Sequence, residues 1–244
     1  MQEEHKNAEV SGMKVGIMQP YFFPYIAYWQ LMNAVDRYVI YDDVNYISRG
    51  WINRNRILVN GQAQHFTLRI SKASQNKRIN EMCLADDRKA RENLLNTVRH
   101  AYKKAPEFDR VYPLIERILT MCENDLTRFL KTQLIWIAEY LGIDTEFVLS
   151  SELEKDNSLR GEEKILQICK LLGAETYVNA IGGQELYSKE RFREENISLR
   201  FLKTDEIEYA QFKNEFVPNL SIIDVMMFNE KPRLREMLGR YELI

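Results

Sequence analysis

The sequence predicts an α/β protein with a mostly parallel sheet that carries helices on both faces. Short apolar runs, typical of buried strands, alternate with amphipathic helical segments along most of the 244 residues. The chain also opens with a strand, a loop, a helix and a strand within about thirty residues, which is the spacing of a βαβ crossover. Three successive helical segments at residues 87–141 interrupt the alternation and predict a helical subdomain or lid.

The opening unit begins with an apolar strand at residues 15–18, which stops before Pro20. Pro20 and Pro24 exclude both regular helix and central strand between them, so the backbone there is expected to follow one stiff path. A helix is expected from about Pro24 to Val35, and a second strand at residues 37–41.

The later elements are predicted from apolar periodicity and from turn residues. Asn60-Gly61 is a favoured hairpin pair, Pro106 ends a helix, and Gly142 and Gly173 follow the ends of two others. In chain order we expect strands at 56–60 and 64–70, a polar loop at 71–78, a strand at 79–84, helices at 87–102, 107–122 and 126–141, a strand at 145–149, a helix at 158–172, a strand at 175–179, a helix at 183–195, a strand at 198–203, and helices at 220–228 and 232–238.

Composition restricts the class of protein. A formal net charge of −2 gives no electrostatic basis for wholesale binding to nucleic acid or to anionic membranes. Residues 13–244 are expected to form one domain, preceded by a polar, disordered extension at residues 1–12. Cys83, Cys122 and Cys169 lack ligand spacing and are interpreted as buried thiols in a reducing compartment. With no apolar run near the ~20 residues of a membrane helix and no signal peptide, a cytoplasmic protein without membrane insertion is expected.

Polar and aromatic residues follow the first two predicted strands. In parallel sheets ligands bind outside the carboxyl ends of the strands, so these residues are the expected centre of a site. After the first strand come Gln19, Pro20, Tyr21, Phe22, Tyr25 and Tyr28. After the second come Asp42 and Asp43, which are suited to proton transfer, ribose binding or metal binding. The alternatives are that the aromatic rings cap the sheet as core and that the two acids belong to a turn.

Two further segments contribute candidate binding residues. The richest polar cluster holds Tyr46, Arg49, Trp51, Asn53, Arg54, Asn55 and Arg56. Arginine forks suit phosphates or carboxylates, and we favour a small anionic ligand over RNA or a solvated surface because the rest of the chain is not basic. Asn179, Gly182 and Gly183 follow a strand, where backbone amides can hold a phosphate or simply form a turn. His65 and His100 have no ligand-spaced partner, so no metal site is predicted from them.

These residues resemble the WbqC-like protein family of bacterial surface-polysaccharide gene clusters. The likeness covers residues 13–28, 41–55, 177–187 and 216–228. It implies a transferase that forms an amide between an amino acid such as glycine, or another acyl group, and the amino group of a nucleotide-linked amino sugar in O-antigen biosynthesis. In such an enzyme Asp42 or Asp43 would take the amine proton and the three arginines of residues 49–56 would hold the diphosphate. Trp51 or Tyr21 would stack on base or sugar.

A fainter likeness is to the nucleotidyltransferase and pantothenate synthetase superfamily, which implies a Rossmann-type fold. Where that superfamily has His-x-Gly-His at the ATP phosphates, this chain has Tyr25, Ala27 and Tyr28. ATP with Mg²⁺ is therefore one candidate cofactor, with the Tyr25 hydroxyl in place of an imidazole. The acyl donor is left open among an adenylate, a thioester and an aminoacyl-tRNA. The alternatives are a non-catalytic sugar-nucleotide or glycan-binding component of the same pathway and an ATP-using relative of the nucleotidyltransferases, and no oligomeric state is predicted.

Overall fold

The computed structural model describes residues 12–244. Its strands are β1 (Lys14–Met18), β2 (Arg37–Ile40), β3 (Arg54–Val59), β4 (Gln62–Thr67), β5 (Ile70–Ser71), β6 (Cys83–Leu84), β7 (Glu146–Leu149), β8 (Thr176–Ala180), β9 (Ser198–Thr204) and β10 (Tyr241–Leu243). Its α-helices are α1 (Ile26–Asn33), α2 (Arg88–Tyr102), α3 (Phe108–Thr120), α4 (Leu126–Leu141), α5 (Gly161–Leu171), α6 (Lys189–Glu194), α7 (Ile222–Phe228) and α8 (Lys231–Leu238). Short 3₁₀ helices are η1 (Ile79–Glu81), η2 (Ser150–Glu152) and η3 (Ile181–Leu186).

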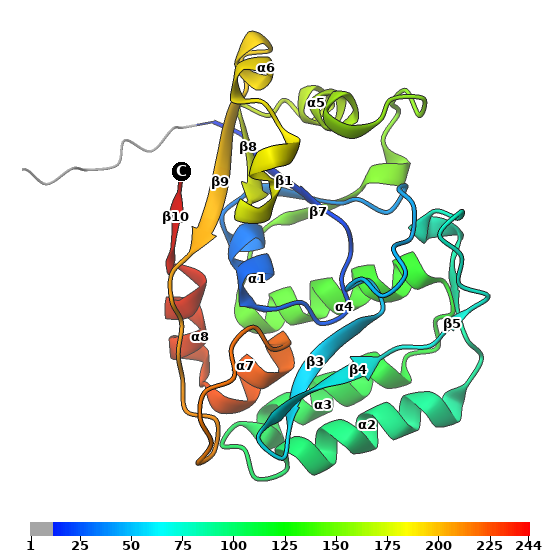
Figure 1. The fold of residues 1–244 in the computed structure, drawn as a ribbon, viewed down its shortest axis with the longest axis vertical. Coiled ribbons are helices and arrows are strands. Elements are labelled where there is room, and N and C mark those ends of the chain that lie inside the picture. The colour runs from blue at the N-terminus through cyan, green and yellow to red at the C-terminus, as the bar shows by residue number, and fades with distance from the viewer. Residues whose placement is uncertain (1–11) are drawn as a thin grey trace, which may run out of the picture.

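The central sheet has six strands in the order β10-β9-β8-β1-β2-β7 (Figure 1). Every pairing is parallel except that of β10 with β9 at the edge. The chain runs outward from β1 through β2 to β7 and then returns, through α5, to place β8 on the other side of β1. The predicted fold class, a mostly parallel α/β sheet, is confirmed.

Helices cover both faces of this sheet, as predicted. One face packs in a small core against α5 and α6, with residues such as Val15, Ile17, Tyr177 and Phe192. The other face packs in a larger core that includes α1, α4, α7 and α8. In Figure 1, α5 and α6 lie at the top of the molecule, and the helical segment α2–α4 lies in its lower half beside the β3–β4 hairpin. The larger core therefore joins the helical segment to the sheet.

The predicted hairpin is confirmed. β3 and β4 pair in antiparallel register around Asn60-Gly61. Both turn residues have positive φ, 51° at Asn60 and 77° at Gly61, as a type I′ turn requires.

Several local predictions need correction. Cys83 and Cys122 are exposed and only Cys169 is buried, because the first two lie on β6 and just after α3 at the surface. The strand expected at residues 79–84 is a 3₁₀ turn followed by the two-residue β6, and the helix expected at 183–195 is η3 followed by the shorter α6. The edge strand β10 is an element that the sequence patterns do not predict. The predicted extension at residues 1–12 lies, except for Gly12, outside the described residues.

None of the helices within residues 12–244 has both the length and the apolar character needed to cross a membrane.

Candidate functional site: an aromatic crevice at the ends of β1 and β8

A crevice of about 460 Å³ opens where the carboxyl ends of β1 and β8 meet. Met18 and Gln19 enter it from the end of β1, and Asn179 and Ala180 from the end of β8. The chain leaves β1 toward β2 on one side and later returns to form β8 on the other, so this is the topological switch point of the sheet. Open α/β sheets place their ligands at this point, because the diverging connections leave a hollow between them.

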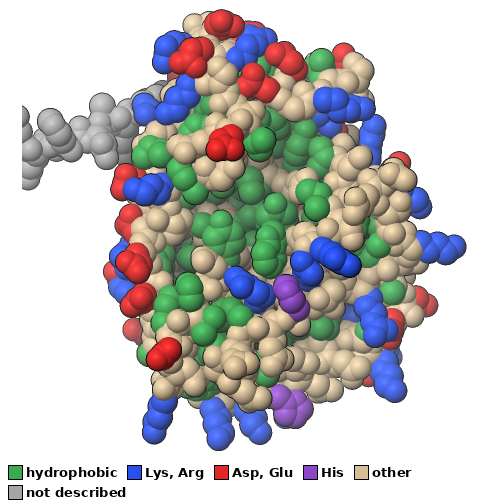
Figure 2. Space-filling model, in the orientation of Figure 1, with side chains coloured by type: hydrophobic (Ala, Val, Ile, Leu, Met, Phe, Trp, Pro, Cys, Tyr) green, Lys and Arg blue, Asp and Glu red, His purple; other side chains and the backbone are tan. Residues whose placement is uncertain are grey.

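Aromatic rings and amide groups form the wall of the crevice. The rings are those of Tyr21, Tyr25, Tyr28, Tyr41, Trp51 and Tyr187. None of the described residues that line it carries a charge. Tyr25 and Trp51 are 37% and 40% exposed, which leaves their faces open to a ligand. In Figure 2 hydrophobic side chains gather at the centre of the face shown, with lysine and arginine side chains around them.

A second hollow of about 300 Å³ adjoins the crevice. Tyr21, Tyr25 and Trp51 line both hollows and form the wall that they share. The second hollow adds Arg56 and Asn219. The site therefore has a neutral, aromatic part and a part that carries a cation.

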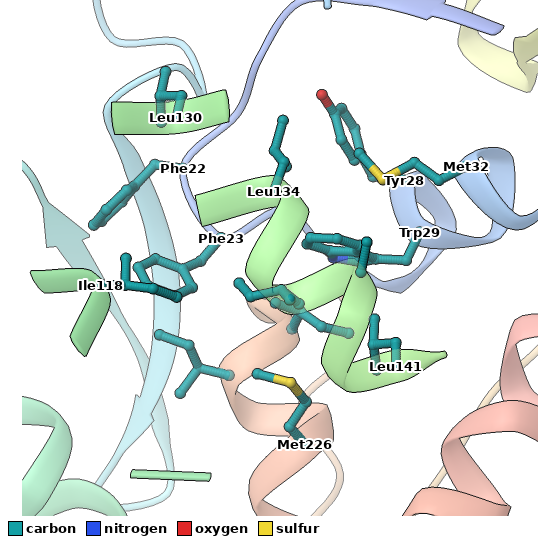
Figure 3. Packing of buried hydrophobic residues seen from close by; sticks show 14 of the residues in the cluster. Phe22, Phe23, Tyr28, Trp29, Met32, Ile118, Leu130, Leu134, Leu141 and Met226 are labelled. Atoms are coloured by element: carbon teal, nitrogen blue, oxygen red, sulfur yellow. The ribbon is translucent and has the colours of Figure 1, made fainter. Parts of the chain in front are cut away.

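Buried polar side chains hold the aromatic loop between β1 and α1. Gln133 of α4 accepts a hydrogen bond from the Phe23 N–H (3.0 Å) and donates one to the Tyr21 carbonyl (3.2 Å). Asn55 of β3 donates to the carbonyls of Phe22 and Phe23, and Ser221 donates to the latter (2.8 Å). Figure 3 shows Phe22 and Phe23 among the residues of the core beneath the loop. Held in this way, the loop presents its exposed rings in a fixed position.

These contacts assign structural roles to some residues predicted to bind substrate. Phe22 is fully buried in the core, and Asn55 uses its amide nitrogen on two loop carbonyls, so neither side chain is free for a ligand here. Tyr28 is likewise buried and donates its hydroxyl to the Gln19 carbonyl (2.8 Å). Gln133 was not among the predicted site residues. The signal was present, because Gln133 falls on the apolar stripe of α4, where a polar residue must find buried partners.

The side chains of residues 46–56, the arginine segment, have two kinds of role: some stabilise the loop, and others line the site. Tyr46 donates to Asn53 Oδ1 (2.8 Å), and Asn53 donates in turn to the Leu68 carbonyl (2.8 Å). Arg54 donates to the carbonyls of Gly50 and Arg49, so it closes the loop that carries Trp51. None of these side chains lines either hollow. Arg49 is also outside them, exposed at a positive φ of 60°.

Asp42 and Asp43 line neither the crevice nor the adjoining hollow. Both are buried, at 1% and 4% exposure. Asp42 accepts hydrogen bonds from the backbone N–H (3.0 Å) and hydroxyl (2.6 Å) of Ser151. Of the candidate residues Gln19, Asp42 and Arg54, only Gln19 lines the crevice.

Asp43 is the centre of a buried ion cluster. Its Oδ2 lies 2.9 Å from Lys155 Nζ and 3.0 Å from Lys164 Nζ, and its Oδ1 accepts from the Ser150 hydroxyl (2.7 Å). Lys164 Nζ also lies 5.0 Å from the ring centroid of Tyr41, which lines the crevice. Through Lys164 the cluster therefore contacts one ring of the crevice wall, and its carboxylate is already engaged.

The two acids have opposite pKa shifts. Burial raises the pKa of Asp42, and the hydrogen bonds from Ser151 only partly offset it. Burial would also raise the pKa of Asp43, but the hydrogen bonds from Lys155, Ser150 and Lys164 outweigh it and hold the pKa below its ordinary value. Asp43 is therefore a poor proton acceptor at neutral pH.

The absence of a side chain at Gly183 leaves room for the Asn179 amide at the crevice. The Asn179 Oδ1 accepts from the Ala180 N–H (2.8 Å), which orients Nδ2 over Gly183. A Cβ built on Gly183 would lie 2.4 Å from that Nδ2, whereas a Cβ on Gly182 would meet nothing within 4 Å. The backbone amides of both glycines remain candidates for ligand binding.

Gly183→Ala should lower the free energy of unfolding by about 1–3 kcal/mol, because the added methyl group displaces a buried side chain. Gly182→Ala is the matched control, with an expected change within about 0.5 kcal/mol at an open surface position. Chemical denaturation of the two variants measures the difference. Equal stability of both would mean that Asn179 moves aside freely.

No cluster of three or more His, Cys, Asp or Glu side chains in residues 12–244 is arranged to hold a metal ion.

Comparison with known proteins identifies the family. The profile of the WbqC-like protein family matches residues 19–236. The uncharacterized protein Rv1507c of Mycobacterium tuberculosis (strain ATCC 25618 / H37Rv) is 27% identical over 219 residues, which cover 88% of this chain and 93% of that protein. No solved structure matches the chain significantly. The matched residues include the aromatic loop, the arginine segment and the end of β8, and the chain belongs to the WbqC-like protein family.

Proposed function

We propose that this protein is a transferase that forms an amide on the amino group of a nucleotide-linked amino sugar, with glycine, another amino acid or an acyl group as the group transferred. The observation that carries the proposal is the uncharged, aromatic crevice at the switch point of the sheet. Tyr25 and Trp51 offer exposed ring faces on which a base or a hexose can stack. Gln19 and Asn179 offer amide groups that can orient hydroxyls.

The absence of carboxylates among the described lining residues suits an amine nucleophile. An amine attacks only in its neutral form, and an apolar surrounding without acidic groups lowers the pKa of a bound amine. In the proposed step the sugar nitrogen bonds to the carbonyl carbon of an activated donor and the bond to the leaving group breaks. The proton lost by the nitrogen leaves with that group, so neither Asp42 nor Asp43 is required as a base.

The carbonyl oxygen gains negative charge during this step, and a fixed donor near it would stabilise the charge. Asn179 is suited to this role. Its Oδ1 is held by the Ala180 N–H, so Nδ2 is oriented before any ligand binds. Such preorganisation requires no rearrangement at the moment of reaction.

The proposal is tested by incubating the protein with nucleotide-linked amino sugars and an adenylate, a thioester or an aminoacyl-tRNA donor, with amide product detected by mass spectrometry. Trp51→Ala should lower kcat/KM by at least about fivefold, because a stacked ring contributes ~1–3 kcal/mol. Phe212→Ala is the matched control, since Phe212 is also 40% exposed and lines neither hollow. Full activity of Trp51→Ala would move the substrate out of the crevice.

A second candidate function is that of a non-catalytic sugar-nucleotide or glycan-binding component. The observation that favours it is the engagement of Asp42 with Ser151 and of Asp43 with two lysines, which leaves neither of these two acids free. In that case Trp51→Ala would weaken binding of the sugar nucleotide in calorimetry, while no donor class would yield amide with the wild-type protein.

A further inference from the structure

Arg56 is the only charged side chain among the described residues that line the crevice and its adjoining hollow. The hollow holds Arg56 beside the shared wall of Tyr21, Tyr25 and Trp51. We propose that this hollow is the anion subsite of a bipartite site, in which Arg56 binds the diphosphate of a nucleotide whose uncharged parts lie in the crevice. The inference rests on the proposed function for the nature of the ligand. Its new element is the place at which the charged diphosphate of that ligand is bound.

The bonding of Arg56 leaves donors for an anion. The only hydrogen bond that its guanidinium makes within residues 12–244 is a long one, from Nη2 to the Asn219 carbonyl (3.3 Å). Its Nε is buried without a partner, and no carboxylate of the described chain lies within ion-pair distance. A half-buried guanidinium without a counter-ion is costly, and a phosphate can supply both the charge and the missing hydrogen bonds.

The backbone around Arg56 is fixed before any ligand binds. Arg56 lies on β3, paired with His65 of β4, and its carbonyl accepts a hydrogen bond from the Ser221 N–H (2.8 Å). Its guanidinium carbon lies 5.8 Å from the centroid of the Trp51 ring, a cation–π distance that restricts the side chain to the site. A preorganised donor of this kind loses little freedom on binding.

The other two arginines of the segment do not fill this role. Arg54 is committed to the carbonyls of Arg49 and Gly50, where it closes the Trp51 loop. Arg49 is exposed and lines neither hollow. The structure therefore gives three different positions to arginines that look alike in sequence. Arg54 stabilises the loop, Arg49 is exposed at the surface, and Arg56 is the candidate anion ligand.

Calorimetry tests the subsite. The protein is titrated with inorganic pyrophosphate, with UDP, dTDP, GDP and ADP, and, for comparison, with the nucleoside of each diphosphate. The wild-type protein should bind pyrophosphate and at least one nucleoside diphosphate, the latter at least about tenfold more tightly than its nucleoside. Arg56→Gln should weaken both anions at least about tenfold and leave nucleoside affinity unchanged, and Arg56→Lys should recover part of the loss. Arg49→Gln, the matched control in the same segment, should change none of these affinities.

Thermal unfolding separates this role from a structural one. Arg56→Gln removes an unpaired charge, so its melting temperature should not fall, and pyrophosphate should raise the melting temperature of the wild-type protein but not of the variant. The inference is overturned if the wild-type protein binds neither pyrophosphate nor any of the diphosphates, or if Arg56→Gln and Arg56→Lys both bind them as the wild-type protein does. If anions bind through Arg56 but no donor yields amide, the subsite stands and the proposed transferase activity does not.

Discussion

Asparagine in place of Asp43 should lower the free energy of unfolding by about 3–5 kcal/mol, because it leaves two lysines without their carboxylate in the interior. The side chains of Lys155, Asp43 and Lys164 are 1%, 3% and 4% exposed, so water does not replace the lost partner. Urea denaturation measures the change. Asp144→Asn, at an exposed position without an ion pair among the described residues, is the control and should change stability by less than about 0.5 kcal/mol.

The effect should depend on pH in a defined direction. The pKa of Asp43 is held below its ordinary value in the folded protein, so its contribution is fully present above the unfolded-state pKa of about 3.9. It is lost as the pH falls through the lower, folded-state pKa. The stability difference between the wild-type protein and Asp43→Asn should therefore be constant near neutral pH and shrink in strong acid. A difference that stays the same down to the acid transition would contradict the ion cluster.

A second substitution separates lost charge pairing from altered packing. Lys155→Met in the Asp43→Asn background removes one of the two unpaired charges and should recover part of the lost stability. No recovery would mean that the introduced amide disturbs the packing around Ser150 instead. Lys164 also lies against Tyr41, which lines the crevice. A loss of activity in Asp43→Asn alone would therefore indicate a displaced crevice wall and not the loss of a catalytic base.

Leucine in place of Gln133 should lower the free energy of unfolding by about 2–4 kcal/mol, since the Phe23 N–H and the Tyr21 carbonyl lose their buried partner together. The loop would then be free to move its aromatic rings out of position. Binding at the crevice should weaken even where the variant remains folded, which ligand-induced thermal shifts would detect. Gln64→Leu, an exposed position on β4, should leave both stability and binding unchanged. Wild-type stability of Gln133→Leu would show that Asn55 and Ser221 hold the loop by themselves.

Local sequence predicted most of the elements and some of the residues that line the candidate site. The type I′ hairpin at Asn60-Gly61 depends on two adjacent residues, and the stiff loop between Pro20 and Pro24 depends on two prolines four apart. Gln19 and Tyr21 were correctly placed after a strand end because parallel strands present their carboxyl ends at one edge. The family resemblance, carried by the same segments, was also confirmed.

The strand opposite β1 at the site was not predictable, because it comes from a distant part of the chain. Asn179, Gly182 and Gly183 are sequence candidates that do line the crevice, but the sequence does not indicate that β8, and not β2, supplies the polar wall opposite β1. Asp42 and Asp43 looked like free acids at a strand end. Ser151 and Lys164 lie 109 and 121 residues further along the chain, and nothing near the acids indicates them.

The sequence by itself determined most of the secondary elements and the aromatic loop, since these follow from spacings of a few residues, and its motifs indicated the family. Tertiary structure decided which side chains face the crevice, which arginine remains without a partner, and which polar residues hold the loop. The physical reason is burial. A buried charge or backbone polar group is stabilised by a partner, and the fold decides which residue becomes that partner. Only the groups that remain unpaired are then available to a ligand.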